Sequence, residues 1–225
     1  MTLPARLLLL ADSRLPAGGH AHSGGLEPAV TAGAVADVAG LARFLRGRLA
    51  TAGLVSAALA AAACAHAAGG ASGWRWDVLD AEADARTPSP AQRAASRAQG
   101  RSLLRAARRT WPHPALDALA ALRAPHQPLV QGAAAAAAGG APPDAAAVSA
   151  YGAVTGPASA AVRLLGLDPL AVHRALADLA PEVDAVAARA ARVPADWAGL
   201  PAPSAPLLDL YAERHLGAGL RLFES

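Results

Sequence analysis

Residues 49–74, LATAGLVSAALAAAACAHAAGGASGW, form the longest stretch of the chain that contains no Asp, Glu, Lys or Arg. A helix of this length could cross a bilayer. Alanine, glycine, serine and threonine dominate the stretch, however, and they supply too little apolar surface for favourable insertion into a membrane. We therefore expect a helix over residues 38–67 that is buried in the core of a soluble protein, with no membrane partner.

The rest of the chain shares this bias towards small residues. Of the 225 residues, 66 are alanine and 32 are leucine, whereas lysine, isoleucine and asparagine are absent. Alanine has the highest intrinsic helix propensity, and no segment alternates apolar and polar residues as a half-buried strand does. The sequence therefore predicts an all-α fold, a single-domain bundle of about 8–10 helices over residues 1–225, stabilised by close packing of small side chains.

Glycine and proline mark the ends of the expected helices. The expected helices cover residues 2–11, 25–33, 38–67, 75–84, 90–109, 114–122, 127–138, 144–165, 169–191 and 204–216. Ser89 and Asp168 each precede a proline, and this arrangement predicts that both are N-caps. In the helix after Asp168, residues spaced by three or four predict the buried face: Leu170, His173, Leu176, Leu179 and Val183.

The composition excludes several classes of function. Without lysine, the chain has neither a Schiff-base lysine nor a P-loop lysine, and its single cysteine, Cys64, excludes an internal disulfide and a multi-cysteine zinc site. The net charge is only +3, and the arginines are scattered among few aromatic residues, so we expect no nucleic-acid partner. No segment is typical of a signal peptide. We expect a cytoplasmic protein without a cofactor.

The glycine-rich loop 12–25, DSRLPAGGHAHSGG, holds most of the side chains that could carry chemistry. His20 and His22 could share a nickel, copper or zinc ion, although no third ligand lies nearby in the sequence. Ser23, with Gly25 after it, resembles part of a nucleophile elbow, a motif that requires a strand before the serine. The loop could therefore belong to a small metal-binding regulator, to a serine hydrolase, or simply to the protein surface.

Two other segments attract attention. Arg93, Ser96 and Gly100 share one face of a helix, which predicts a helix-packing seam where the arginine finds a carbonyl or carboxylate partner. The proline-rich segment and C-terminal tail, residues 193–225, end in apolar residues although chain ends usually fray. This tail either docks on its own domain or inserts into a partner protein.

Four segments, taken in order along the chain, resemble the UreF family of urease accessory proteins. They are LPAGGHAHSGGLEPAV at residues 15–30, QRAASRAQGRSLL at 92–104, PHQPLVQG at 125–132 and HLGAGLRLFES at 215–225. The resemblance implies an all-α, usually dimeric scaffold without catalysis of its own. It also implies that the scaffold bridges UreD, also called UreH, and the nickel-loaded GTPase UreG, and that the assembly delivers nickel to apo-urease.

Site residues also follow from the resemblance. The residues that it implies for partner binding are Glu27, His215, Leu220, Arg221, Leu222, Phe223 and Ser225. The sequence departs from the family pattern where His20-Ala21-His22-Ser23 replaces an aromatic FSYS, near Asp168, where a glutamine is missing, and at Leu216, which replaces a glutamate. We do not transfer the roles of those side chains. His20 and His22 remain weak metal candidates.

Overall fold

The computed structural model describes residues 5–70, 73–217 and 222–223, without the side chain of His20. Leu220, Arg221 and Ser225, three of the residues expected to bind a partner, lie outside the described residues. Within the described part the regular elements are helices, without a β-strand, which confirms the all-α prediction.

The helices begin and end close to the positions predicted from glycine, proline and the N-cap residues. They are α1 (Ala5–Ala11), α2 (Leu26–Thr31), α3 (Val38–Arg48), α4 (Leu54–Ala68), α5 (Trp76–Ala85), α6 (Pro90–Thr110), α7 (Pro114–Leu119), α8 (Gln127–Ala137), α9 (Pro142–Leu165), α10 (Pro169–Ala190) and α11 (Pro206–Leu216). A short π-helix, Leu49–Gly53, joins α3 to α4 without a break.

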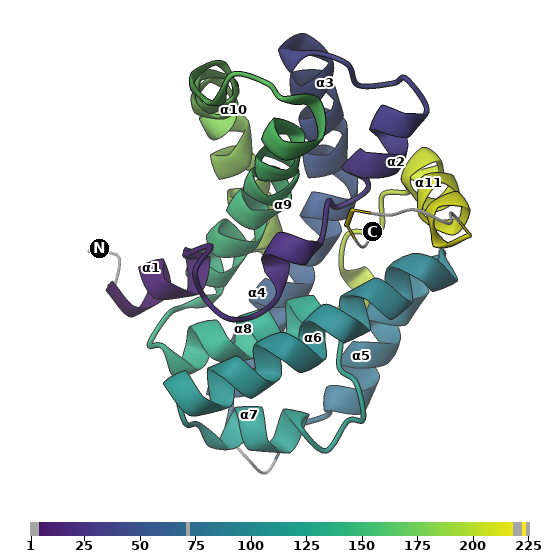
Figure 1. The fold of residues 1–225 in the computed structure, drawn as a ribbon. Helices are drawn as coiled ribbons and strands as arrows, with labels where there is room; N and C mark the ends of the chain where they lie inside the picture. Colours follow the sequence, from purple (N-terminus) through teal and green to yellow (C-terminus); the bar gives the residue numbers. More distant parts are fainter. Residues whose placement is uncertain (1–4, 71–72, 218–221, 224–225) are drawn as a thin grey trace.

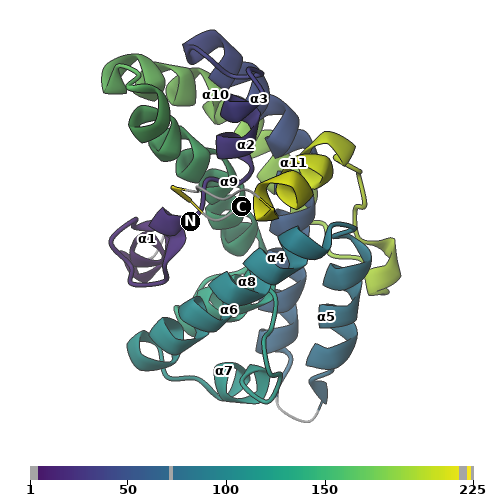
Figure 2. The same cartoon turned by 45° about the vertical axis from the view of Figure 1, so that its right-hand side comes forward.

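Helix α4 is the centre of the molecule, and it packs against α8, α9 and α10. Helices α6, α7 and α8 lie on one side of it, whereas α3, α9 and α10 lie on the other (Figure 1). Helix α1 stands at the edge of the bundle in both views (Figure 2), where it packs against α8 and α9. Helix α11 packs against α6 and α2, so a late element of the chain lies next to one near its N-terminal end.

Small side chains let the central helices approach closely. A Cβ atom added to Gly132 of α8 would lie 2.1 Å from the carbonyl oxygen of Ala60 in α4, so the two backbones are in direct contact. Ala133, Ala134 and Ala135 follow on α8 with no exposed surface. Close packing of this kind gives a dense core from residues that each bury little area. The alanine content of residues 49–74 is thereby explained.

The helical run Val38–Ala68 is long and apolar enough to cross a membrane, judged by length and composition alone. In its most apolar window, however, 67% of the residues are buried inside the protein. This burial is what the sequence led us to expect of a core helix.

The predicted buried face of α10 is partly wrong. Leu179 is buried, but Leu170 is 79% exposed and His173 is also exposed. The buried residues of α10 include Val172 and Ala190. Alanine occurs on every side of this helix, so the spacing of the larger residues did not reveal which face meets α9 and α4.

Arg86, at the end of α5, fixes the proline-rich segment that precedes α11. Its guanidinium donates hydrogen bonds to the carbonyl oxygens of Trp197, Leu200 and Pro201 at 3.1, 3.0 and 3.2 Å. The same group pairs with Glu82 one turn earlier on α5. Charge-assisted hydrogen bonds of this kind are about twice as strong as neutral ones. They hold in place a segment without regular structure and so position α11.

Candidate functional site

The glycine-rich loop ends in two residues with left-handed backbone, Gly24 at φ +61° and Gly25 at φ +88°. These conformations let α2 begin immediately, at Leu26. Ser23 is completely buried, and its hydroxyl oxygen accepts a hydrogen bond from the backbone N–H of Glu27 at 3.2 Å. The loop therefore fixes Glu27 in the first turn of α2, where only 8% of the residue is exposed.

The side chain of Arg48 packs against this loop. Its Nε donates a hydrogen bond to the carbonyl oxygen of Ala153 at 3.2 Å, and a Cβ atom on Gly24 would lie 3.1 Å from its guanidinium carbon. Burial lowers the pKa of Arg48 to about 10, so the side chain remains charged at neutral pH. The loop thus rests on a cationic side chain that leaves no room for a larger residue than glycine.

The carboxylate of Glu27 holds the C-terminal segment. Its Oε1 accepts a hydrogen bond from the backbone N–H of Leu222 at 2.8 Å, and its Oε2 accepts one from Phe223 at 2.9 Å. An ionised carboxylate that accepts two N–H groups is a strong anchor for the bend at residues 222–223. Two parts of the chain separated by 195 residues are joined in this way.

His215 and Arg163 complete the anchor. The Nε2 atom of His215 lies 3.0 Å from the carbonyl oxygen of Phe223 and 3.5 Å from Oε2 of Glu27. Both neighbours are acceptors, so Nε2 carries the hydrogen and donates it. The guanidinium of Arg163 lies 4.4 Å from the centre of the Phe223 ring, within the range of a cation–π interaction. Helices α2, α9 and α11 therefore hold one aromatic residue between them.

Leu222 differs from the residue that follows it. Phe223 is only 6% exposed, whereas Leu222 is 75% exposed. Residues 222 and 223 form a bend in which both backbone N–H groups face Glu27. The side chain of Phe223 is buried there, while that of Leu222 faces solvent. The last residue of α11, Leu216, is 56% exposed. The anchored segment thus presents apolar side chains on the surface.

A second polar cluster lies where α6 crosses the start of α8. Ser96 Oγ lies 2.9 Å from Nδ1 of His126, and a Cβ atom on Gly100 would lie 2.0 Å from the carbonyl oxygen of Pro125. Arg93, on the same face of α6, donates a hydrogen bond to the carbonyl oxygen of Thr87 at 2.7 Å. Ser96 and Gly100 therefore lie at a close contact between α6 and the start of α8, whereas Arg93 bonds to the segment that precedes its own helix.

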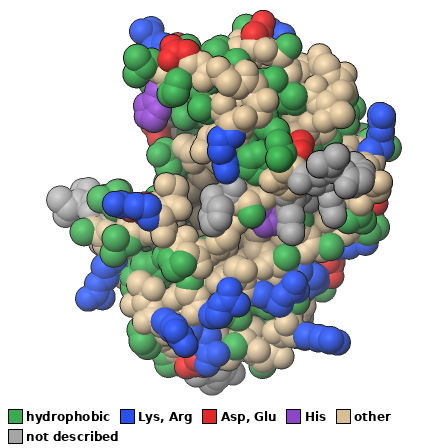
Figure 3. All heavy atoms as spheres, viewed as in Figure 1, with side chains coloured by type: hydrophobic (Ala, Val, Ile, Leu, Met, Phe, Trp, Pro, Cys, Tyr) green, Lys and Arg blue, Asp and Glu red, His purple; other side chains and the backbone are tan. Residues whose placement is uncertain are grey.

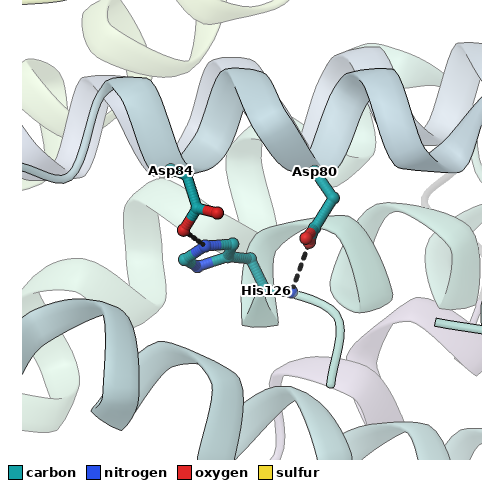
Figure 4. Close-up of side chains that lie close together, drawn as sticks. All are labelled: Asp80, Asp84 and His126. Atoms are coloured by element: carbon teal, nitrogen blue, oxygen red, sulfur yellow. Dashed lines mark hydrogen bonds and ion pairs between the residues drawn. The ribbon is translucent and has the colours of Figure 1, made fainter. Parts of the chain in front are cut away.

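Two aspartates of α5 enter the same cluster (Figure 4). The Nε2 of His126 lies 2.9 Å from Asp84, and its backbone N–H donates to Asp80 at 3.0 Å. Arg97 pairs with the two carboxylates at 2.9 and 2.7 Å. Burial raises the pKa of Asp84, but hydrogen bonds from His126 and Arg97 outweigh it and leave this pKa below its usual value. Burial is also the main cause that lowers the pKa of His126.

Within the part of the chain that the structure describes, Asp80, Asp84 and His126 are the group whose three ligand atoms could hold a metal ion, all within 4.8 Å of one another. Arg97 already balances both carboxylates, and both ring nitrogens of His126 are engaged. The arrangement is that of a satisfied structural network. The network is not among the sites expected from the sequence, although Asp80 and Asp84 are spaced by one helical turn and so share a helix face.

Comparison with known proteins places the chain in a family. The sequence model of UreF matches residues 35–180. A urease accessory protein UreF of Mycolicibacterium vanbaalenii is 49% identical over 225 residues, all of both chains. The UreF of Mycobacterium tuberculosis is 46% identical over 215 residues, which cover 96% of this chain and 95% of the relative. The chain belongs to the UreF family of urease accessory proteins. It is therefore an accessory protein and not an enzyme.

Membership of the UreF family removes one alternative for the loop. Ser23, the expected nucleophile of a serine hydrolase, is completely buried and contacts the backbone of Glu27. A nucleophile elbow needs a strand before the serine, whereas residues 5–22 contain α1, a 3₁₀ turn at Gly19–Ala21 and irregular segments. The hydrolase interpretation is therefore wrong.

The residues expected to bind partners in this UreF-family chain fall into two sets. Glu27, His215 and Phe223 meet in the anchor, and Leu222 lies on its outer side. His22 is half-buried in the loop and does not belong to the three-ligand group that the described residues form. The side chain of His20, its expected partner, lies outside the described residues, so a metal ion shared by the two histidines stays a prediction.

Proposed function

We propose that this chain is a urease maturation factor that bridges a UreD-type protein, also called UreH, and the GTPase UreG. In this role it acts as a scaffold without catalysis of its own, and nickel is the cargo that the assembly delivers to apo-urease. Membership of the UreF family supports a role in urease maturation. The identities of the partners rest on the family resemblance of four sequence segments, including the tail 215–225.

The observation that carries the proposal is the anchored C-terminal segment. Glu27, His215 and Arg163 hold Phe223 inside the domain while Leu222 remains 75% exposed. Complete burial of a leucine side chain is favourable by about 1.5–3 kcal/mol relative to exposure. Because the backbone N–H of Leu222 is already bonded to Glu27, the backbone loses less conformational freedom on binding, and this increases the affinity for an apolar pocket. We assign this surface to the UreD-type partner.

The test is co-purification of the chain with its UreD and UreG homologues after co-expression. Leu222→Asp should abolish capture of the UreD homologue and should lower the nickel content of urease in the same cells. Leu170→Asp is the matched control, because Leu170 is 79% exposed and lies on α10, a helix that contributes no residue to the anchor. Equal capture by both variants would show that Leu222 does not contact the partner.

A truncation separates binding from folding. Deletion of residues 220–225 should leave the helical domain folded, with helical circular dichroism and a cooperative melting transition, but should abolish capture of the UreD homologue. Phe223→Ala should weaken this capture by roughly 2 kcal/mol, about thirtyfold, because it loosens the segment that presents Leu222. If truncation unfolds the domain, the tail belongs to the core; if capture survives, the tail does not bind the partner.

We also propose that the protein is a homodimer in the cytoplasm. The structure uses part of the alanine-rich surface within the chain, where α4 meets α8. Exposed small residues remain on α10, such as Ala177, Ala180 and Ala188, and small residues allow two helices to pack closely. Light scattering should give twice the chain mass of 22.4 kDa. A value equal to one chain over a wide concentration range would contradict the dimer.

A further inference from the structure

Helix α6 has an unusual charge distribution. Its 21 residues include six of the chain's 20 basic residues and no acidic residue: Arg93, Arg97, Arg101, Arg105, Arg108 and Arg109. Arg101, Arg105 and Arg109 follow one another at intervals of four residues. Like charges at this spacing repel each other and destabilise a helix. The dipole of α6 favours a cation in the last turn, at Arg109, but the helix has no acidic residue that could pair with the rest of the row.

The six arginines of α6 differ in whether they find partners. Arg97 pairs with aspartates of α5, and Arg108 pairs with Asp117 of α7 at 2.7 Å. Among the described residues, three members of the row form no hydrogen bond or ion pair, and neither does Arg123, which follows α7. These four exposed side chains are Arg101, Arg105, Arg109 and Arg123. Folding brings them together although Arg123 is distant in sequence.

These arginines line a continuous groove between α6 and the segment that joins α7 to α8. Two adjoining hollows, of about 500 and 470 Å³, share Arg101, Leu122 and Arg123. The second hollow extends along α6 over Leu104 to Arg109. Figure 3 shows basic side chains gathered over α6 and α7 on the lower part of this face. The groove therefore combines the apolar side chains of Leu104 and Leu122 with unpaired guanidinium groups. Its acidic lining residues, Asp80 and Asp117, are already paired with Arg97 and Arg108.

We propose that this α6–α7 groove binds an acidic segment of a partner protein that also carries apolar side chains. Guanidinium groups match carboxylates in bidentate geometry, and four of them without partners provide matching positions along the segment. Leu104 and Leu122 would receive its apolar side chains. The inference goes beyond the proposed function, because it does not depend on Leu222 or on the anchored C-terminal segment.

The geometry favours a protein segment over other anions. No aromatic side chain lines either hollow, whereas binding of single-stranded nucleic acid relies on aromatic stacking. Phosphate sites use free N–H groups at helix N-termini, but at the start of α8 the N–H groups of His126 and Gln127 already bond to Asp80 and Ser96.

The test uses a fluorescently labelled peptide of about 12 residues in which glutamate and leucine alternate, titrated with the full chain at low ionic strength, where electrostatic attraction is little screened. We expect saturable binding that weakens at least tenfold when salt is raised to about 0.5 M. The double variant Arg101→Glu/Arg105→Glu should bind the peptide at least tenfold more weakly and should keep its fold, because neither arginine has a partner within the described residues.

A matched control is the double variant Arg43→Glu/Arg189→Glu, which changes the net charge equally at exposed sites on α3 and α10. It should bind like the wild type. An equal loss of peptide affinity in this control would show that the peptide is attracted by the net charge of the protein and not by the groove. If a peptide with glutamine in place of glutamate binds equally well, the arginines do not contribute to peptide binding. Tighter binding of a single-stranded DNA of similar length, or no peptide binding at low salt, would overturn the proposal.

Discussion

Replacement of Glu27 should release the C-terminal segment while the helical bundle stays folded. The carboxylate accepts the backbone N–H groups of Leu222 and Phe223 at 2.8 and 2.9 Å. Hydrogen bonds to a charged group contribute roughly 1.5–3 kcal/mol each. At the lower value, Glu27→Ala removes about 3 kcal/mol of docking free energy, and every 1.4 kcal/mol changes an equilibrium tenfold. The segment should therefore open about a hundredfold more often.

Glu27→Gln supplies an intermediate point in the same series. A glutamine side chain keeps one oxygen acceptor and places an NH₂ group where the second acceptor was, so it retains one of the two hydrogen bonds. The loss is then about 1.5 kcal/mol, which corresponds to roughly tenfold more frequent opening. A graded order of wild type, Gln and Ala would identify the hydrogen bonds as the cause.

Hydrogen exchange measures this opening directly, because the two amide hydrogens that exchange are those bonded to Glu27. Exchange in a C-terminal peptide should accelerate by the stated factors, while peptides from α4 and α8 keep their protection. Glu182→Ala is the control, since Glu182 is a half-exposed glutamate paired with Arg46 at the surface. Unchanged exchange at Leu222 and Phe223 in Glu27→Ala would refute the idea that the carboxylate holds the segment.

Three further predictions concern the core. Gly100→Ala should destabilise the protein by about 1–3 kcal/mol in urea unfolding, because its Cβ would lie 2.0 Å from the carbonyl oxygen of Pro125. The control Gly47→Ala, at a glycine with open space around it, should be neutral or stabilising by up to about 1 kcal/mol. Cys64 should react with a thiol reagent only after unfolding, because burial and then Asp144 raise its pKa to about 12; rapid reaction of the native protein would contradict this. Burial lowers the pKa of His66 below 6.5, so the unfolded chain binds a proton first, and stability should fall as the pH drops below about 6.5. Urea unfolding of His66→Gln should show a smaller loss between neutral and mildly acidic pH than the wild type.

Helix positions could be predicted because the relevant signals are local. Ser89 caps α6 by accepting a hydrogen bond from the backbone N–H of Gln92 at 3.1 Å. Asp168 caps α10 by accepting hydrogen bonds from Leu170 and Ala171 at 3.1 and 3.2 Å. Proline follows each cap, so two adjacent residues are enough to predict where each helix begins. The helix face that becomes buried depends on crossing partners elsewhere in the chain, and for Leu170 the spacing gave the wrong answer.

The candidate site was only partly predictable for the same reason. Glu27, His215 and Phe223 were singled out separately, through a family resemblance, and nothing in the sequence indicated that they would meet. The arginines seemed scattered along the chain, whereas the fold places Arg123 beside the free arginines of α6. Asp84 pairs with Arg97 and His126, which lie 13 and 42 positions further along the chain. Contacts between residues so far apart in the sequence produce no periodic pattern by which they could be predicted.

The anchor between Glu27 and Phe223 has a consequence for the order of events during protein synthesis. Glu27 is made early, whereas the two backbone N–H groups that it binds belong to residues made 195 and 196 positions later. The helices of the bundle all precede residue 222 within the described residues, so they can leave the ribosome while this carboxylate still lacks its donors. The anchor can close only after residues 222 and 223 have emerged, and until then the carboxylate of Glu27 is left to water.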